Sequence, residues 1–119
     1  MRLAFGTAAV FLAAGSALAG EANVIDVKVT TAGSEFRFEV TVAHADEGWD
    51  HYADRWEVVG PGGEVLAVRM LAHPHENEQP FTRSLAGVEI APEVGRVRVR
   101  AHDSVHGEGG AEIEVTLPR

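Results

Sequence analysis

Short segments in which every second residue is apolar limit this chain to β-structure. The alternation is clearest at 36–42, 97–99 and 113–117, where the intervening residues are charged or polar. A period of two is typical of a strand with one buried face, because successive side chains point to opposite faces of a sheet. After residue 20, no segment has the period of an amphipathic helix. The sequence therefore predicts an all-β fold.

The number and spacing of these segments predict a particular class of all-β fold. Seven short strands separated by turns indicate a seven-stranded antiparallel β-sandwich, immunoglobulin-like or fibronectin type III-like. Trp56 corresponds to the buried tryptophan of such sandwiches, and we expect a bulge at Gly87. The chain has no cysteine, so it lacks the antibody-type disulfide, which favours the fibronectin type III-like form. A small barrel is the alternative. The expected strands lie at 25–29, 36–42, 56–58, 65–71, 81–90, 96–100 and 112–117.

The first 19 residues have the pattern of an export signal. Arg2 provides a positive start, and the following segment to Ala19 is uncharged and largely apolar. The segment ends in Ala-Leu-Ala at 17–19, the small-x-small pattern that signal peptidase recognises. Cleavage would leave 20–119 as a single domain. We expect that domain to be periplasmic or secreted, monomeric and free of the membrane, with a retained amino-terminal anchor as the alternative.

The charge balance excludes nucleic acid as a partner. The chain has 18 acidic and 10 basic side chains and a formal net charge of −8, whereas nucleic-acid binding requires a basic surface. A cation or a basic protein is a better match. The absence of cysteine also excludes thiolate metal sites and a cysteine nucleophile.

All six histidines lie in or beside loops that we expect at one end of the sandwich. Because successive antiparallel strands alternate in direction, the loops at 45–54, 72–80 and 102–110 should emerge together. We call this end the histidine pole. The turns at 31–34, 60–64 and 91–95 should emerge at the opposite end, and they contain no histidine.

The spacing of these histidines predicts a site for a divalent metal ion. Pro74 keeps the backbone extended between His73 and His75, so their imidazoles should project on the same side. A turn separates His102 from His106, and Asp103 within it can orient a ligand. Imidazole together with carboxylate suits Zn(II) or Cu(II). The expected ligands are His51, His73, His75, His102 and His106.

Other residues of the pole have supporting or structural roles in this interpretation. His44 continues the two-residue spacing of the apolar positions at 36–42, so it should lie on the same buried face, which favours a structural role. His51 could pack its own loop, with Asp50 as a partner that orients its ring. We expect Arg83 to pair with a carboxylate of the pole and to support it.

Four motifs resemble those of a family of small exported bacterial proteins of uncharacterised function. They are WDHYADRW at 49–56, HPH at 73–75, EQPFTRSL at 78–85 and RAHDSVHG at 100–107. The resemblance extends over most of the chain after the expected signal. It implies an exported single-domain protein and carries no activity, cofactor or partner with it.

Three functions remain open from the sequence. The first is an exported metal-binding module that uses the histidine pole. The second is a metal-free domain that presents the same loops to a protein or small ligand, with Trp49 and Tyr52 as anchors. The third is a small metalloenzyme, which is disfavoured because the chain offers no clear nucleophile or base beyond the same histidines and acids.

Overall fold

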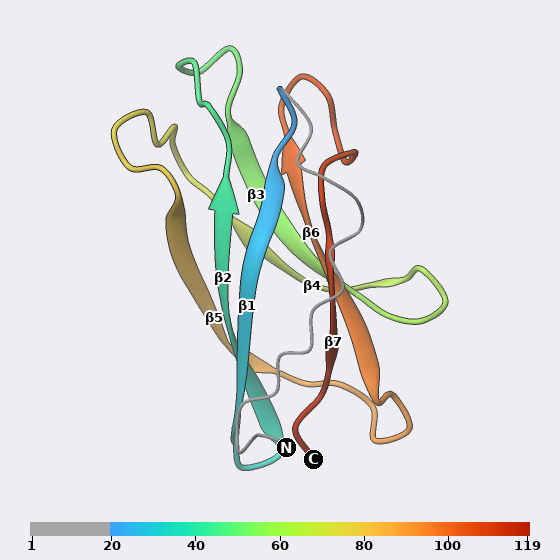
Figure 1. Cartoon of the computed structure of the whole chain (residues 1–119). Coiled ribbons are helices and arrows are strands. Elements are labelled where there is room, and N and C mark those ends of the chain that lie inside the picture. Colours follow the sequence, from blue (N-terminus) through green and yellow to red (C-terminus); the bar gives the residue numbers. More distant parts are fainter. Residues whose placement is uncertain (1–19) are drawn as a thin grey trace.

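The computed structural model describes residues 20–119, so the expected export signal lies outside the described residues. This part of the chain is all-β, with no helix long and apolar enough to cross a bilayer. Figure 1 shows the order of the strands along the chain. The strands are β1 (Asn23–Ala32), β2 (Glu35–Ala43), β3 (Ala53–Val59), β4 (Val65–Met70), β5 (Phe81–Val88), β6 (Arg96–Asp103) and β7 (Ile113–Thr116).

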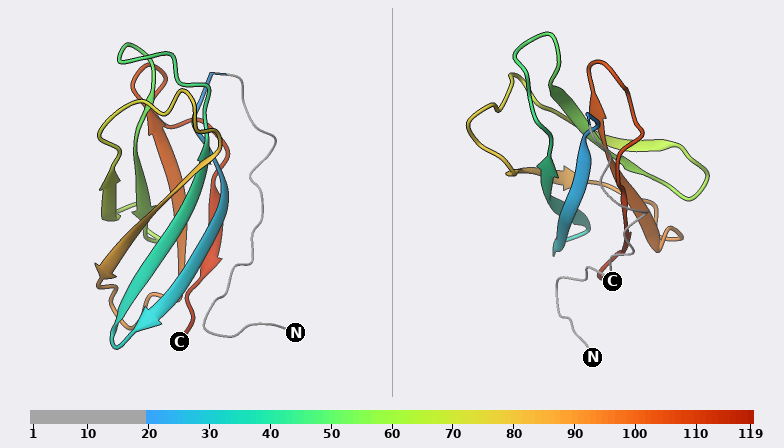
Figure 2. Two further views of the ribbon diagram at one scale, coloured as in Figure 1. Left: turned by 90° about the vertical axis from the view of Figure 1, so that its left-hand side faces the viewer. Right: turned by 45° about the horizontal axis from the view of Figure 1, so that its top comes forward.

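The seven strands form two antiparallel sheets that face each other (Figure 2). One sheet has the order β1-β2-β5, and the other has the order β4-β3-β6-β7. The chain crosses between the sheets after β2, β4 and β5, which is the arrangement of a fibronectin type III-like sandwich. The predicted fold class is confirmed.

The core is formed by the inward faces of both sheets. Phe38 and Val40 of β2 are fully buried, as are Trp56 of β3 and Val99 of β6. Burial of one such side chain contributes about 1.5–3 kcal/mol to stability. The chain has no disulfide, so this apolar layer holds the two sheets together.

Bulges interrupt the regular pairing of β1 with β2 and of β2 with β5. The register of β1 against β2 shifts between Val24 and Asp26, so Val24 and Val27 both point inward. Ile25, expected on the buried face, is 43% exposed for this reason, and that expectation was wrong. The predicted bulge at Gly87 is confirmed, because the register of β5 slips there and Gly87 has a φ of +71°. A glycine suits this backbone conformation because it has no Cβ to clash.

The loops of the histidine pole lie together at the upper end in Figure 1, where β1 also begins. They connect β2 to β3, β4 to β5 and β6 to β7. The turns from β1 to β2 and from β5 to β6 lie at the lower end. The amino-terminal residues of the described chain are therefore neighbours of the histidine loops, although they are distant in sequence.

Candidate metal centre

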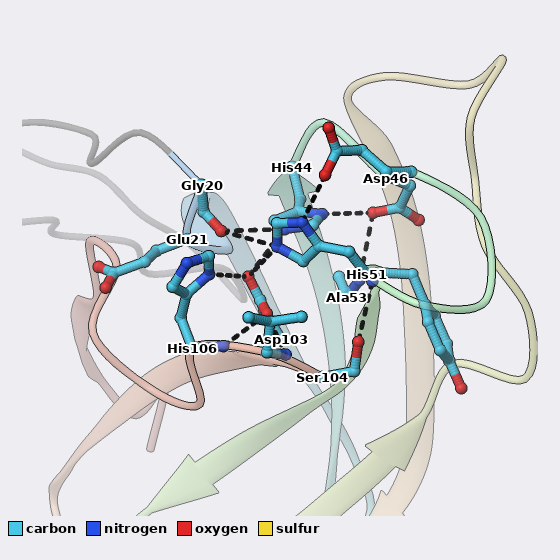
Figure 3. Close-up of polar contacts among 12 residues, drawn as sticks. Gly20, Glu21, His44, Asp46, His51, Ala53, Asp103, Ser104 and His106 are labelled. Atoms are coloured by element: carbon cyan, nitrogen blue, oxygen red, sulfur yellow. Dashed lines mark hydrogen bonds and ion pairs between the residues drawn. The ribbon is translucent and has the colours of Figure 1, made fainter.

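Four side chains come together where β2 and β6 end and where their loops begin (Figure 3). His44 directly follows β2, and His51 lies in the loop toward β3. Asp103 is the last residue of β6, and His106 lies in the turn after it. We call these four residues the His/Asp cluster.

The turn after β6 is built around the Asp103 carboxylate. Its Oδ1 accepts hydrogen bonds from the backbone amides of Val105 and His106, at 2.6 and 2.8 Å. The backbone of Asp103 also pairs with Gly107, whose amide donates to the Asp103 carbonyl at 2.9 Å. These contacts leave the second carboxylate oxygen, Oδ2, pointing at the histidines.

Three imidazole nitrogens surround this one oxygen atom. Asp103 Oδ2 lies 2.9 Å from His44 Nε2, 3.0 Å from His51 Nε2 and 3.0 Å from His106 Nδ1. Ligand atoms of His44, His51 and Asp103 all lie within 4.8 Å of one another. Among residues 20–119, His44, His51 and Asp103 form a group of histidine and carboxylate side chains that could hold a metal ion.

A second carboxylate lies behind the rings of both His44 and His51. His44 Nδ1 is 2.5 Å from Asp46 Oδ1, and His51 Nδ1 is 2.6 Å from Glu47 Oε1. Asp46 is fixed in turn by the backbone amides of Ala53 and His75. Metal-binding histidines usually have this arrangement, with one nitrogen on the metal and the other hydrogen-bonded to a carboxylate that orients the ring.

Hydrogen-bond counting shows that the cluster needs added protons or a cation. A carboxylate only accepts hydrogen bonds, so a histidine nitrogen that faces one needs a proton or a metal ion to make the contact favourable. Both nitrogens of His44 and both of His51 face carboxylates. An oxygen has two lone pairs, yet three nitrogens converge on Asp103 Oδ2. A cation at this point would satisfy the nitrogens and the carboxylate together.

Burial increases across the cluster from one side to the other. The side chains of His44 and Asp103 are fully buried, whereas those of His51 and His106 are 16% and 38% exposed. Burial acts to raise the pKa of Asp103, but hydrogen bonds from the His106 ring and from the His106 and Val105 amides outweigh it and hold that pKa well below its usual range. The cluster therefore keeps a buried anion with histidines between it and solvent.

The pKa of His51 makes stability without metal dependent on pH. Hydrogen bonds to Glu47 and then Asp103 raise the pKa of His51 to about 9, against about 6.5 in an unfolded chain. The folded state thus binds this proton more tightly. The resulting stability should be fully present below about pH 6.5 and lost as the pH rises through about 9.

Denaturant unfolding from pH 6 to 9.5 with a chelator would measure this loss of stability. In the Glu47→Gln variant the His51 pKa should be lower, so the loss should begin at a lower pH. Identical pH profiles for both proteins would contradict the role of Glu47 in raising the His51 pKa.

The other predicted ligands lie outside the His/Asp cluster. His102 pairs with Asp54, at 2.6 Å between Nδ1 and Oδ1. His73 and His75 lie beside each other with ring centroids 4.7 Å apart, and His75 stacks on Phe81 at 4.1 Å. Burial lowers the pKa of His75, as expected for a ring packed on an aromatic side chain. The structure thus brings two of the predicted ligands, His51 and His106, to one point, and it places the other three outside the His/Asp cluster.

The predicted supporting residues are placed as follows. Asp50 is exposed, and Glu47 is the acid that contacts the outer nitrogen of His51. Arg83 pairs with Glu78 of the same pole at 2.9 Å, which is the kind of support expected from the sequence. Trp49 and Tyr52 pack edge to face, with centroids 5.5 Å apart.

Sequence reasoning missed His44 and Asp46 as members of the site. The spacing of His44 from the apolar positions of 36–42 correctly indicates that it is buried. A buried histidine two residues from an acid is the signal that could have identified His44 and Asp46. A histidine is expensive to bury unless both of its nitrogens have partners. Asp46 and Asp103 supply those partners here.

The fold and the site together define an all-β sandwich with a buried histidine–aspartate cluster that could hold a metal ion. No protein-family model and no solved structure matches the chain. A protein of Halomicrobium mukohataei described as a "Putative lipoprotein" is 44% identical over 96 residues. The match covers 80% of this chain and 47% of the relative, so the chain spans about half the length of the curated relative that it matches.

Proposed function

We propose that this protein is an exported module that binds a divalent metal ion, Zn(II) or Cu(II), in the His/Asp cluster. The ligands are His44, His51 and Asp103, with His106 as the most exposed fourth ligand. The observation that carries the proposal is the convergence of three imidazole nitrogens on one carboxylate oxygen, with further carboxylates behind two of the rings.

The donor atoms and their spacing suit these metals. Three imidazole nitrogens and a carboxylate oxygen are ligands that Zn(II) and Cu(II) both accept. Two ligand atoms about 2.0–2.1 Å from a tetrahedral zinc ion lie about 3.3–3.4 Å apart. To hold such an ion, the 2.9 and 3.0 Å separations around Asp103 Oδ2 would widen slightly. The remaining separations between ligand atoms, which are up to 4.8 Å, would shorten. An ion would also replace the protons that the histidine nitrogens otherwise need.

Export is supported by two separate observations. The amino-terminal segment ends in the small-x-small pattern at 17–19. The Halomicrobium mukohataei relative is described as a lipoprotein, which is a class of exported, envelope-associated proteins. A metal site built from histidine and carboxylate alone is compatible with an oxidising compartment because it contains no thiol to oxidise. We infer a role in holding or passing on metal outside the cytoplasm.

The test is calorimetric titration of the protein with Zn(II) and with Cu(II) at fixed pH and ionic strength. His51→Ala removes a proposed ligand and should weaken binding of the preferred metal about 100-fold or more. Asp46→Asn removes the acid behind His44, keeps all the proposed ligands and should weaken binding about 10–100-fold, as loss of a carboxylate behind a ligand usually does.

His73→Ala and His102→Ala are the matched controls, because both residues belong to the same pole but lie outside the cluster. Both variants should bind metal like the unmodified protein. If His73→Ala removes binding and His51→Ala does not, the ion is held by the 73–75 segment and the ligand set proposed here is wrong. Measuring at two salt concentrations separates site binding from diffuse attraction to the acidic pole.

A second candidate function is the metal-free contact domain, and Trp49 is the observation that favours it. Trp49 is 66% exposed, and its ring packs against Tyr52 in the loop between β2 and β3. Large exposed aromatic side chains are common anchors of protein interfaces. The same titration separates the two functions, since a protein that binds neither metal retains only this second role.

A further inference from the structure

We propose that the amino group of Gly20, released when the export signal is removed, is an additional ligand of the same metal ion. The proposal rests on the proposed function and extends it. Removal of the signal would then complete the metal site, so the exported protein would bind metal more tightly than its precursor does.

Gly20 lies against the His/Asp cluster (Figure 3). Its carbonyl oxygen is 3.1 Å from His51 Nε2 and 3.3 Å from His44 Nε2. These are the two nitrogens that face Asp103 Oδ2. A Cβ on Gly20 would lie 3.1 Å from Cε1 of His106. The residue thus contacts His44 and His51 and lies beside His106, and a larger side chain would press on the His106 ring.

Hydrogen bonds hold the residues after Gly20 against the sandwich, so the fold determines the position of Gly20. The amide of Val24 donates to the Ala111 carbonyl at 2.9 Å, and the Ala111 amide donates to Asn23 Oδ1 at 2.8 Å. Ala22 is buried, and a Cβ on Gly110 would lie 2.0 Å from its carbonyl oxygen. Only glycine permits this close approach, which packs the start of the chain against the loop before β7.

The predicted cleavage position coincides with the residue found at the cluster. The small-x-small pattern ends at Ala19, so cleavage after it makes Gly20 the first residue. The contacts of Gly20 come from the structure and the cleavage position comes from the sequence, and neither depends on the other. Together they place a new amino terminus beside three imidazoles.

Cleavage changes the donor chemistry of this residue. In the precursor the Gly20 nitrogen is part of a peptide bond, and its lone pair is delocalised into the carbonyl. After cleavage it is an amine, a nitrogen donor of the kind that Cu(II) and Zn(II) accept. The amine nitrogen and the carbonyl oxygen of one residue can bind one ion in a five-membered chelate ring.

The experiment compares two proteins that differ by one residue. The full precursor is exported in a bacterial host, and mass spectrometry should show a mature chain that begins at Gly20. A second protein begins at Ala19, which moves the free amine along by one residue. We expect the Ala19 form to bind Cu(II) at least tenfold more weakly. Labelling with ¹⁵N-glycine should change the nitrogen hyperfine coupling of bound Cu(II) in the Gly20 form alone.

A third protein, the Gly20 form with His44→Gln, separates this inference from the proposed function. If this variant binds weakly while the Gly20 and Ala19 forms have equal affinities and spectra, the amino terminus is not a ligand and the proposed metal site stands. If His44→Gln binds like the unmodified protein, the proposed site is wrong and the inference falls with it. A mature chain that begins elsewhere also overturns the inference. Matching circular dichroism spectra without metal, recorded well below each melting temperature, would show that all three proteins fold alike.

Discussion

Replacing Asp103 with alanine should lower the free energy of unfolding by about 3–5 kcal/mol, the usual cost of breaking a buried charged pair. The carboxylate is fully buried and accepts two backbone amides of its own turn. It is also the partner of three imidazoles, so its removal leaves the buried His44 facing an empty space. A domain of this size has about 5–15 kcal/mol of stability in total, so the variant should be close to unfolding. Denaturant titration with a chelator present would measure the loss.

Asp103→Asn is the matched variant for this prediction. Its side-chain oxygen can still accept the Val105 and His106 amides, while its NH₂ group replaces the oxygen that faces the histidines. It should therefore lose less stability than the alanine variant. Asp50→Ala, at an exposed acid of the same pole, should change stability by no more than about 0.5 kcal/mol. A loss below about 1 kcal/mol for Asp103→Ala would show that the cluster does not support the fold.

Saturation with the preferred metal should raise the free energy of unfolding by about 2.7 kcal/mol at a hundredfold excess over the dissociation constant. The reason is mass action, because the ligands come from distant parts of the chain and converge only in the folded state. His44 follows β2, whereas Asp103 ends β6. Melting curves recorded with and without Zn(II) or Cu(II) would show the shift.

The His51→Ala variant should lose this metal-dependent increment. Glu93→Ala, at an exposed acid between β5 and β6, should keep it in full. Coincident curves for the unmodified protein with and without both metals would instead favour the metal-free contact domain.

The fold could be predicted closely because apolar and polar residues alternate along a strand according to which face is buried. Each inward residue of β2 and β6 follows the period of two. Ile25 breaks the pattern because a bulge inserts one extra residue into β1, and no glycine or proline in that segment signals it. Strand topology also places all three histidine loops at one end, which is why His51 and His106 could be identified as candidates.

The composition of the site was less accessible from the sequence. Pro74 between His73 and His75 indicates that their imidazoles project from the same side of the backbone, but it does not determine which way the loop turns. His75 instead packs on Phe81 of β5, where stacking on a buried aromatic ring is favourable. The position of Gly20 beside the cluster depends on contacts between the start of the chain and the loop before β7, and such long-range contacts leave no local pattern.

The gradient of burial across the cluster determines how an ion held there would exchange. Asp103 belongs to β6, which is hydrogen-bonded on both sides within its sheet, whereas His51 and His106 lie in loops and reach solvent. If an ion is bound as proposed, His51 and His106 can therefore detach one at a time while His44 and Asp103 hold it. A protein that acquires the metal would add its own donors from the solvent side, through an intermediate in which the ion is shared. Transfer from the proposed site by this stepwise substitution would need no unfolding of the sandwich and would release no free ion.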